Sequence, residues 1–280
     1  MKGEAAFERL LELLKLDALD RDLFLGETPR GEGRLFGGLV AAQAAMAAME
    51  TVEGASLHSL HAYFLRPGRH DTPIRFIVHR IRDGRSFTTR RVVAYQAGEA
   101  IFNLSTSFAK PEEGISHQTP APEAPGPEGL PDWEELRARM LGRPEAVRHQ
   151  PIEVRACDPD DPEGGPQEPR KRVWFRPSGA VPDDPRIHTA LLVYASDRTL
   201  ISTASRPHGL PWGKRMVASL DHAMWIHREP RFDDWVLYAS ESPVAHAARG
   251  LVFGGMYDLQ GHRIASVAQE GLIRIPRRAP

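Results

Sequence analysis

Cysteine, surplus positive charge and long apolar runs are all scarce in this chain of 280 residues. Its single cysteine, Cys157, cannot form an internal disulfide, which is typical of proteins from reducing compartments, and we expect a cytoplasmic protein. Lysine and arginine number 36 against 37 aspartates and glutamates, so no basic surplus is present for general nucleic-acid binding. The longest apolar stretch, residues 35–49, includes Gln43 and is shorter than the roughly 20 residues that a membrane-spanning helix needs. We therefore expect no nucleic-acid partner and no membrane segment.

Sequence motifs of several enzyme classes are also missing. No G-x-S-x-G pattern occurs, which disfavours the nucleophilic serine of an α/β-hydrolase. The possible metal ligands Asp221 and His227 would lie about 20 Å apart on an extended strand at ~3.3 Å per residue, too far to share an ion. We expect neither a metal ion nor a bound cofactor.

Proline marks the organisation of the chain. Twelve of its 24 prolines fall between Pro111 and Pro169, and such a segment cannot continue a helix or a central strand. We expect a first unit, a proline-rich linker and a second unit, at residues 1–110, 111–150 and 151–280. Within the linker, residues 132–141 can form a short helix with Asp132 as its N-cap.

The two units repeat one pattern, a long apolar helix followed by about four strands. In the first unit the helix is expected at 35–49 and the strands at 59–67, 74–84, 86–98 and 99–109. In the second unit the helix is expected at 188–203 and the strands at 219–230, 235–244, 248–261 and 263–275. Ser59 aligns with Ser219, and the turn residue Gly98 aligns with Gly261. The pattern predicts a duplicated α+β fold in which each helix is buried against a curved antiparallel sheet.

Three polar residues of the second unit lie where the pattern places apolar ones. Asp197 falls in the helical run, and the residues three and four positions away on either side are Val193, Tyr194, Leu200 and Ile201. Gln269 lies among small or apolar residues on one face of the last strand, and Ser219 begins an earlier strand. A buried carboxylate has a raised pKa, which suits a general base. From the pattern alone, a hydrogen-bonded structural role for Asp197 and Gln269 is an equally good interpretation.

Seven short motifs follow one another along the chain: LFGGLVAAQA, LHSLHAYFLRPG, RDGRSFTTRRV, ASDRTL, SLDHAMWIHR, ARGLV and VAQEGLIR. They fall within residues 20–110 and 187–275, and RDG-x-SF-x-x-RRV and LDH-x-MW-x-H are long enough to be specific. In sequence and order they resemble the TesB-like acyl-CoA thioesterase II family. The resemblance implies a double hotdog fold, with two tandem hotdog units whose long helices are wrapped by a continuous antiparallel sheet. It also implies hydrolysis of acyl-CoA thioesters to free fatty acid and CoA.

The resemblance further implies a catalytic role for the three polar residues. The family's active site uses an aspartate in the second hotdog helix, a serine or threonine just before the DH of LDH-x-MW, and the glutamine of QEG. These positions are occupied by Asp197, Ser219 and Gln269. Asp197 would take the proton of an attacking water, while Ser219 and Gln269 would hold that water in line with the thioester.

Contacts to the rest of the substrate are less specific in the sequence. A backbone N–H at a helix N-terminus would hold the oxyanion, and Gly37 and Gly38 are candidates because the backbone can be approached closely there. The start of the helix expected at 188–203 is another candidate. Arginines would bind the CoA phosphates, with Arg90, Arg91 and Arg249 as candidates, although a role as solvated surface residues explains them equally well. The expected partners are acyl-CoA and, from the resemblance, further copies of the chain in a homo-oligomer.

The first unit lacks an equivalent set of polar residues. Thr106 aligns with Gln269, and no acidic residue occurs in the run 35–49. We expect one active site per chain, with the first unit lining the acyl or pantetheine tunnel. The residues on whose packing its depth would depend include Met46, Phe64, Trp225 and Phe253.

Two other functions stay open at this point. A hotdog hydratase or dehydratase would need a histidine and an aspartate working together, and the neighbours Asp221 and His222 diverge on an extended strand. A non-catalytic module that only binds acyl-CoA would not need Asp197, so the intact set of three polar residues argues against it.

Overall fold

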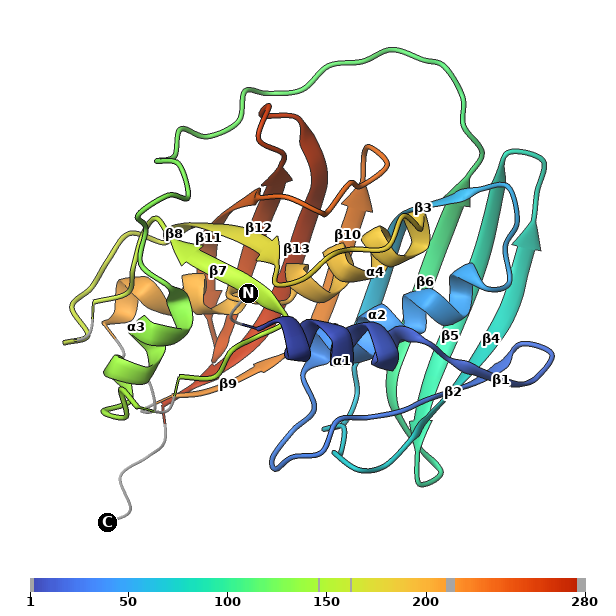
Figure 1. Ribbon diagram of the computed structural model, residues 1–280, viewed down its shortest axis with the longest axis horizontal. Coiled ribbons are helices and arrows are strands. Elements are labelled where there is room, and N and C mark those ends of the chain that lie inside the picture. The colour runs from blue at the N-terminus through green and yellow to red at the C-terminus, as the bar shows by residue number, and fades with distance from the viewer. Residues whose placement is uncertain (1–2, 146, 162, 210–214, 276–280) are drawn as a thin grey trace.

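Two helix-and-sheet units share a single sheet in this protein (Figure 1). The computed structural model describes residues 3–145, 147–161, 163–209 and 215–275, and these residues form one antiparallel sheet of thirteen strands. The helices are α1 (Glu4–Leu14), α2 (Gly37–Met49), α3 (Trp133–Met140), α4 (Pro185–Ser196) and the 3-10 helix η1 (Leu200–His208). The strands before the linker are β1 (Asp17–Asp20), β2 (Leu23–Gly26), β3 (Ser56–Phe64), β4 (Ile74–Asp83), β5 (Phe87–Gln96) and β6 (Glu99–Ala109). Those after it are β7 (Ile152–Ala156), β8 (Arg170–Pro177), β9 (Met216–Ser219), β10 (Asp221–Ile226), β11 (Val236–His246), β12 (Arg249–Tyr257) and β13 (Arg263–Arg274).

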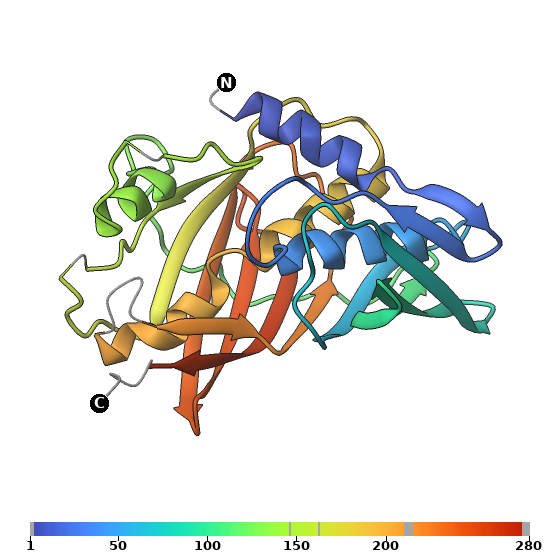
Figure 2. The same cartoon turned by 90° about the horizontal axis from the view of Figure 1, so that it is seen from below.

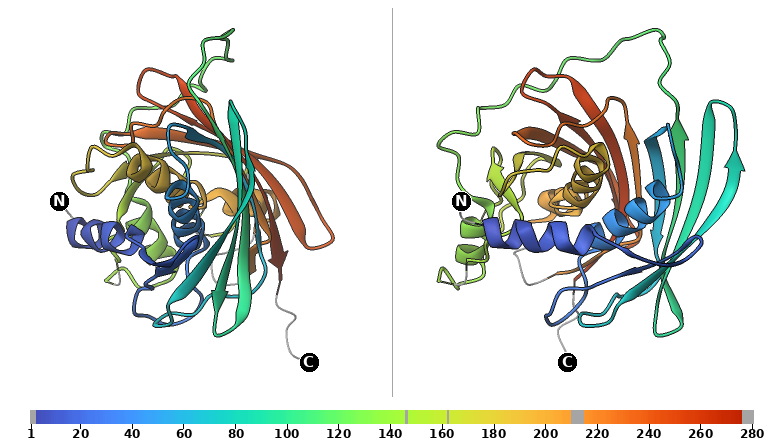
Figure 3. Two further views of the ribbon diagram at one scale, coloured as in Figure 1. Left: turned by 90° about the vertical axis from the view of Figure 1, so that its right-hand side faces the viewer. Right: turned by 45° about the vertical axis from the view of Figure 1, so that its right-hand side comes forward.

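The two units are joined edge to edge at the middle of the sheet. The strand order is β1-β2-β4-β5-β6-β3-β10-β13-β12-β11-β8-β7, and β9 pairs with β13 off this path. At the junction β3 pairs with β10, so that Leu60 lies opposite Met224. The sheet curves around the helices, as the side views in Figure 3 show. Its inner face is therefore buried against the helices, while much of its outer face is exposed.

The central helices α2 and α4 lie together on the inner face of the sheet (Figure 2). Every residue of α2 after Gly37 is buried, which its alanine-rich, uncharged sequence allows. Gly38 permits the close contact with α4, because a Cβ atom there would lie 2.6 Å from the carbonyl oxygen of Tyr194. The start of α2 is thus held against the last turn of α4. Among the described residues, no helix is long and apolar enough to cross a membrane.

The proline-rich segment between β6 and β7 packs on the outer face of the second unit (Figure 1). Ala121, Ala124 and Leu130 cover an aromatic cluster around Trp174, whose indole N–H donates a 2.8 Å hydrogen bond to the carbonyl oxygen of Pro125. The short helix predicted at residues 132–141 is confirmed as α3. Asp132 caps it by accepting hydrogen bonds from the N–H groups of Glu134 and Glu135 at 2.8 and 3.2 Å.

The duplicated order of helix and strands is confirmed, and the fold is the α+β double hotdog that the family resemblance implies. Two details of the second unit differ. The helix predicted at residues 188–203 ends at Ser196, and η1 continues the chain after a left-handed turn at Thr199. The strand predicted at residues 219–230 is divided at Leu220 into β9 and β10. Both breaks lie beside the polar residues discussed next.

Candidate active site

Asp197 is the first residue beyond α4 and forms the C-cap of that helix. At this helix end the hydroxyl of Ser196 bonds back to the carbonyl oxygen of Val193 at 2.8 Å. The N–H of Arg198 reaches only three residues back, to the carbonyl oxygen of Ala195. Asp197 therefore caps the helix, and its carboxylate also contacts Gln269 of β13.

The three predicted catalytic side chains meet at this helix end. Gln269 Nε2 donates a 2.7 Å hydrogen bond to Oδ1 of Asp197, and Ser219 Oγ lies 3.3 Å from the same oxygen. Ser219 pairs with Gly271 of β13, two residues from Gln269, so both side chains lie on the inner face of the sheet. Gln269 is buried, and its Oε1 has no hydrogen-bond partner among the described residues. The amide thus presents an unused acceptor next to the carboxylate.

The electrostatic environment of Asp197 suits proton transfer near neutral pH. Loss of solvent raises the pKa of its carboxyl group from 3.8 to about 6. Hydrogen bonds from Gln269, the Gly38 N–H and Ser219, together with the charge of Arg198, lower the pKa and partly offset this rise. The carboxylate is therefore mostly ionised at pH 7, yet basic enough to accept a proton.

The N-terminus of α2 lies against the other oxygen of Asp197. A Cβ atom on Gly37 would lie 3.0 Å from Oδ2 of Asp197 and 2.6 Å from the ring of Phe64. Phe36, the N-cap of α2, packs edge-on against Tyr194 with ring centroids 5.0 Å apart. The structure thus brings the predicted glycines to the site, where a side chain at Gly37 would crowd the carboxylate.

The first unit has a buried arginine beside the end of its central helix. Arg90 Nε and Nη2 bond to the hydroxyl and carbonyl oxygens of Thr51, just beyond the end of α2, at 2.9 and 3.2 Å. Thr106 of β6, which aligns with Gln269 of β13, lies opposite Arg90 and donates a hydrogen bond to the carbonyl oxygen of Arg90. Gln269 instead lies opposite Val252, an apolar residue. A buried cation therefore lies beside the end of α2, while the acidic C-cap of that helix, Glu50, is exposed and pairs with Arg186. This difference from the end of α4 supports one active site per chain.

The arginines predicted to bind CoA phosphates do not lie at this site. The side chain of Arg90 is 1% exposed and fully engaged, so it is not accessible to a ligand. Arg91 and Arg249 project from the outer face of the sheet, because their neighbours on β5 and β12 are the ones that face the helices. Arg249 there pairs with Glu270 at 3.0 Å. The thickness of the sheet separates both from Asp197.

The same alternation also excludes two of the four residues that the sequence suggests for the acyl tunnel. Trp225 and Phe253 are 38% and 45% exposed on the outer face, whereas Met46 lies in the core and Phe64 contacts the site.

Sequence reasoning did not single out Arg198, which follows Asp197 directly. It also missed Glu134 of the linker, whose side chain bonds to Arg198, because no local pattern connects residues so distant in sequence.

His222 lies behind the site but does not pair with Asp197. Its Nε2 is 2.8 Å from the hydroxyl of Ser196, and burial lowers the pKa of its ring to about 4, so it is neutral at pH 7. Asp221 accepts a hydrogen bond from the N–H of Glu270 on the neighbouring strand. The two neighbours diverge, and this arrangement gives no support to a hydratase.

Among the residues that the structure describes, no group of three or more His, Cys, Asp or Glu side chains could hold a metal ion.

Comparison with known proteins identifies the family. Residues 147–272 match the family model for acyl-CoA thioesterase, and residues 26–109 match that for the acyl-CoA thioesterase N-terminal domain. Acyl-CoA thioesterase 2 of Haemophilus influenzae is 38% identical over 95% of this chain and 96% of its own. Acyl-coenzyme A thioesterase 8 of Mus musculus is 36% identical over 98% of this chain and 92% of its own.

Solved structures agree with this result. An acyl-CoA thioesterase II of Mycobacterium marinum superposes with a TM-score of 0.81 at 40% identity, covering 96% of this chain and 99% of its own. A protein of Alicyclobacillus acidocaldarius with a hot dog fold has the same TM-score at 19% identity and supports the fold alone. The chain therefore belongs to the TesB-like acyl-CoA thioesterase II family.

Proposed function

We propose that this protein hydrolyses acyl-CoA thioesters to a free fatty acid and CoA by direct attack of a water molecule. The observation that carries the proposal is the convergence of Asp197, Ser219 and Gln269 at the end of α4. Similarity over nearly the whole chain to proteins named acyl-CoA thioesterases supports the reaction type.

The geometry suggests how the water is held. Asp197 and the unpartnered Oε1 of Gln269 are two neighbouring acceptors for the two protons of one water molecule. Ser219 fixes the carboxylate by donating to Oδ1. Asp197 takes one proton as the water oxygen attacks the thioester carbonyl, which forms a tetrahedral intermediate. When the C–S bond breaks, the electron pair leaves with the CoA sulfur, which then takes the proton from Asp197.

The oxyanion of that intermediate needs donors at the start of α2. Because the Gly38 N–H donates to Asp197, we assign the oxyanion contact to the N–H of Gly37. The absence of a side chain at Gly37 leaves the space next to Asp197 Oδ2 for the reacting carbonyl group.

The proposal is tested by measuring thiol release from a series of acyl-CoAs of increasing chain length. Asp197→Asn keeps the shape of the side chain but cannot accept the proton, and we expect kcat to fall about 10²–10⁴-fold. Glu50→Gln is the matched control, since Glu50 caps the end of α2 as Asp197 caps α4, but forms an exposed ion pair with Arg186. It should hydrolyse at the wild-type rate.

Equal rates for wild type and Asp197→Asn would refute the assignment of the general base. No hydrolysis of any chain length by the wild type, combined with tight binding of acyl-CoA, would instead support a binding module.

A further inference from the structure

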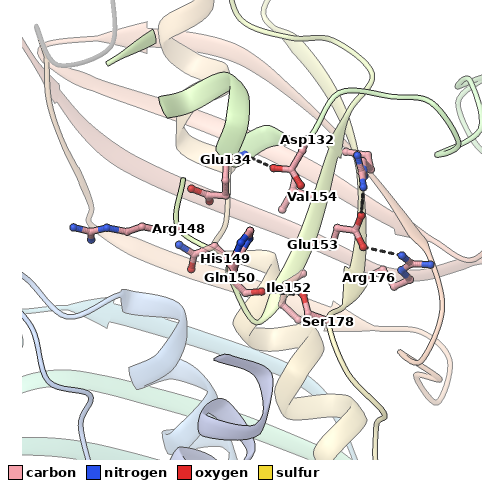
Figure 4. Close-up of a pocket in the computed structure, with 11 residues that line it drawn as sticks. Asp132, Glu134, Arg148, His149, Gln150, Ile152, Glu153, Val154, Arg176 and Ser178 are labelled. Atoms are coloured by element: carbon pink, nitrogen blue, oxygen red, sulfur yellow. Dashed lines mark hydrogen bonds and ion pairs between the residues drawn. The ribbon is translucent and has the colours of Figure 1, made fainter. Parts of the chain in front are cut away.

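The linker helix α3 is fixed firmly against the second unit. Trp133, its first residue, is buried with its ring 3.8 Å from Lys171 Nζ, and Asp132 caps the helix. Figure 4 shows Glu134, in the first turn of α3, beside Gln150 and the strand β7. The proline-rich segment is thus not only a connector, because it places one acidic side chain at a defined position.

Glu134 bonds to the residue that follows Asp197. Its Oε1 accepts a 2.8 Å hydrogen bond from Arg198 Nη2, and the two side chains are only 12% and 11% exposed. Arg198 Nη1 also lies 3.4 Å from Oε1 of Gln150. An ion pair with so little solvent contact has a fixed geometry, unlike most pairs at the surface.

The backbone that this ion pair anchors is strained. Thr199, directly after Arg198, has a φ of +62°, a conformation that a β-branched residue rarely adopts. Such strain persists only where surrounding contacts enforce it. On one side, the hydroxyl of Ser202 bonds to the carbonyl oxygen of Thr199. On the other, the side chain of Arg198 is held by the linker.

From this geometry we propose that α3 positions the catalytic carboxylate, with Arg198 as a positioning residue that acts through its ion pair with Glu134. The inference rests on the proposed function and adds the linker to the active-site structure. When the pair is lost, the turn at Arg198 and Thr199 relaxes, and Asp197 at the helix end no longer aligns with Gln269. Because the acyl-CoA does not need this alignment to bind, the effect falls on the chemical step.

The test measures kcat, KM and the melting temperature of Glu134→Gln, Arg198→Met and the double variant. Small displacements of a catalytic group are costly, so we expect kcat to fall about 10-fold in each single variant with KM unchanged. The double variant should be no slower than either single variant, because both remove the same contact.

Glu153→Gln is the matched control. Glu153 also pairs with arginines, Arg155 and Arg176, and is 16% exposed in the same pocket as Glu134. It should lower the melting temperature about as much as Glu134→Gln while leaving kcat unchanged. Equal kcat values for Glu134→Gln and wild type, with only a lower melting temperature, would refute the positioning role.

A crystal structure of Glu134→Gln provides a readout apart from activity. We expect the contact between Asp197 and Gln269, 2.7 Å in the wild type, to be lost. An unchanged contact would overturn the inference even if the protein were an active thioesterase. Absence of hydrolysis by the wild type would refute the proposed function and, with it, the catalytic role of α3.

Discussion

Gln269 controls both the charge of Asp197 and the position of the water in the proposed mechanism. We therefore expect Gln269→Leu, which keeps most of the volume and removes both polar atoms, to change the rate and its pH dependence together. In the wild type, kcat/KM should fall as the pH drops below about 6, because protonated Asp197 cannot accept a proton.

The size of the change follows from the 2.7 Å hydrogen bond between Gln269 Nε2 and Asp197 Oδ1. A hydrogen bond to a charged group contributes about 1.5–3 kcal/mol, and one pKa unit corresponds to about 1.4 kcal/mol. Losing a bond that favours the ionised carboxylate should move the acid limb of the profile upward by about one to two pH units. Loss of the acceptor Oε1 should also lower the high-pH plateau by about 100-fold.

The assay is kcat/KM for one acyl-CoA between about pH 5 and pH 9, followed by the loss of thioester absorbance. Gln43→Leu is the matched control, because Gln43 is an equally buried glutamine whose Nε2 donates to the carbonyl oxygens of Leu13 and Glu27 at 2.7 and 2.8 Å. It should reduce stability without moving the acid limb. An acid limb at the wild-type position in Gln269→Leu would show that Asp197 is not the titrating base.

Three further outcomes are expected. Ser219→Ala should lower kcat only about 10-fold, as expected for an orienting group; a loss as complete as that of Asp197→Asn would indicate a covalent nucleophile. Asp197→Asn should raise the free energy of unfolding in urea by up to about 3 kcal/mol at pH 8, because a carboxyl group whose pKa rises from 3.8 to about 6 on folding opposes folding when ionised. This difference should shrink as the pH falls from about 6 and disappear below 3.8, where both folded and unfolded states hold the proton, and a constant difference would contradict the electrostatic cause. Arg90→Met should lower the free energy of unfolding by about 2–4 kcal/mol, since Thr51 loses its buried partner, whereas the exposed neighbour change Arg91→Met should alter it by less than about 0.5 kcal/mol. Equal unfolding curves for the two arginine variants would argue against a structural role for Arg90.

Much of this architecture follows from local patterns in the sequence. The uncharged, alanine-rich sequence of α2 is suited only to a helix that is covered on all sides. The alternation of apolar and polar residues in the strands predicts which face of each strand points into the core. The small or apolar neighbours of Gln269 at even spacing along its strand predict that it faces inward, and the structure places it there. The motif resemblance then selected Asp197, Ser219 and Gln269 as one set. Association with further copies of the chain stays a prediction.

Other features depend on distances that no local pattern contains. The period of two places Arg90 and Arg91 on opposite faces of β5, but only the packing of the helices shows which face is covered and that Arg90 bonds to Thr51. The apolar stripe predicts a helix to residue 203, whereas α4 ends at Ser196, because the stripe does not reveal the left-handed turn at Thr199.

The sequence by itself thus determined the duplicated fold and marked Asp197 and Gln269 as polar residues on apolar faces, since burial and periodicity act over a few neighbouring residues. The catalytic role of these residues and Ser219 stays a prediction that the family resemblance implies. Only the tertiary structure decided which oxygen of Asp197 each partner contacts and that α3 reaches Arg198. Those contacts join segments up to 72 residues apart, and their geometry depends on how the sheet and helices pack as a whole.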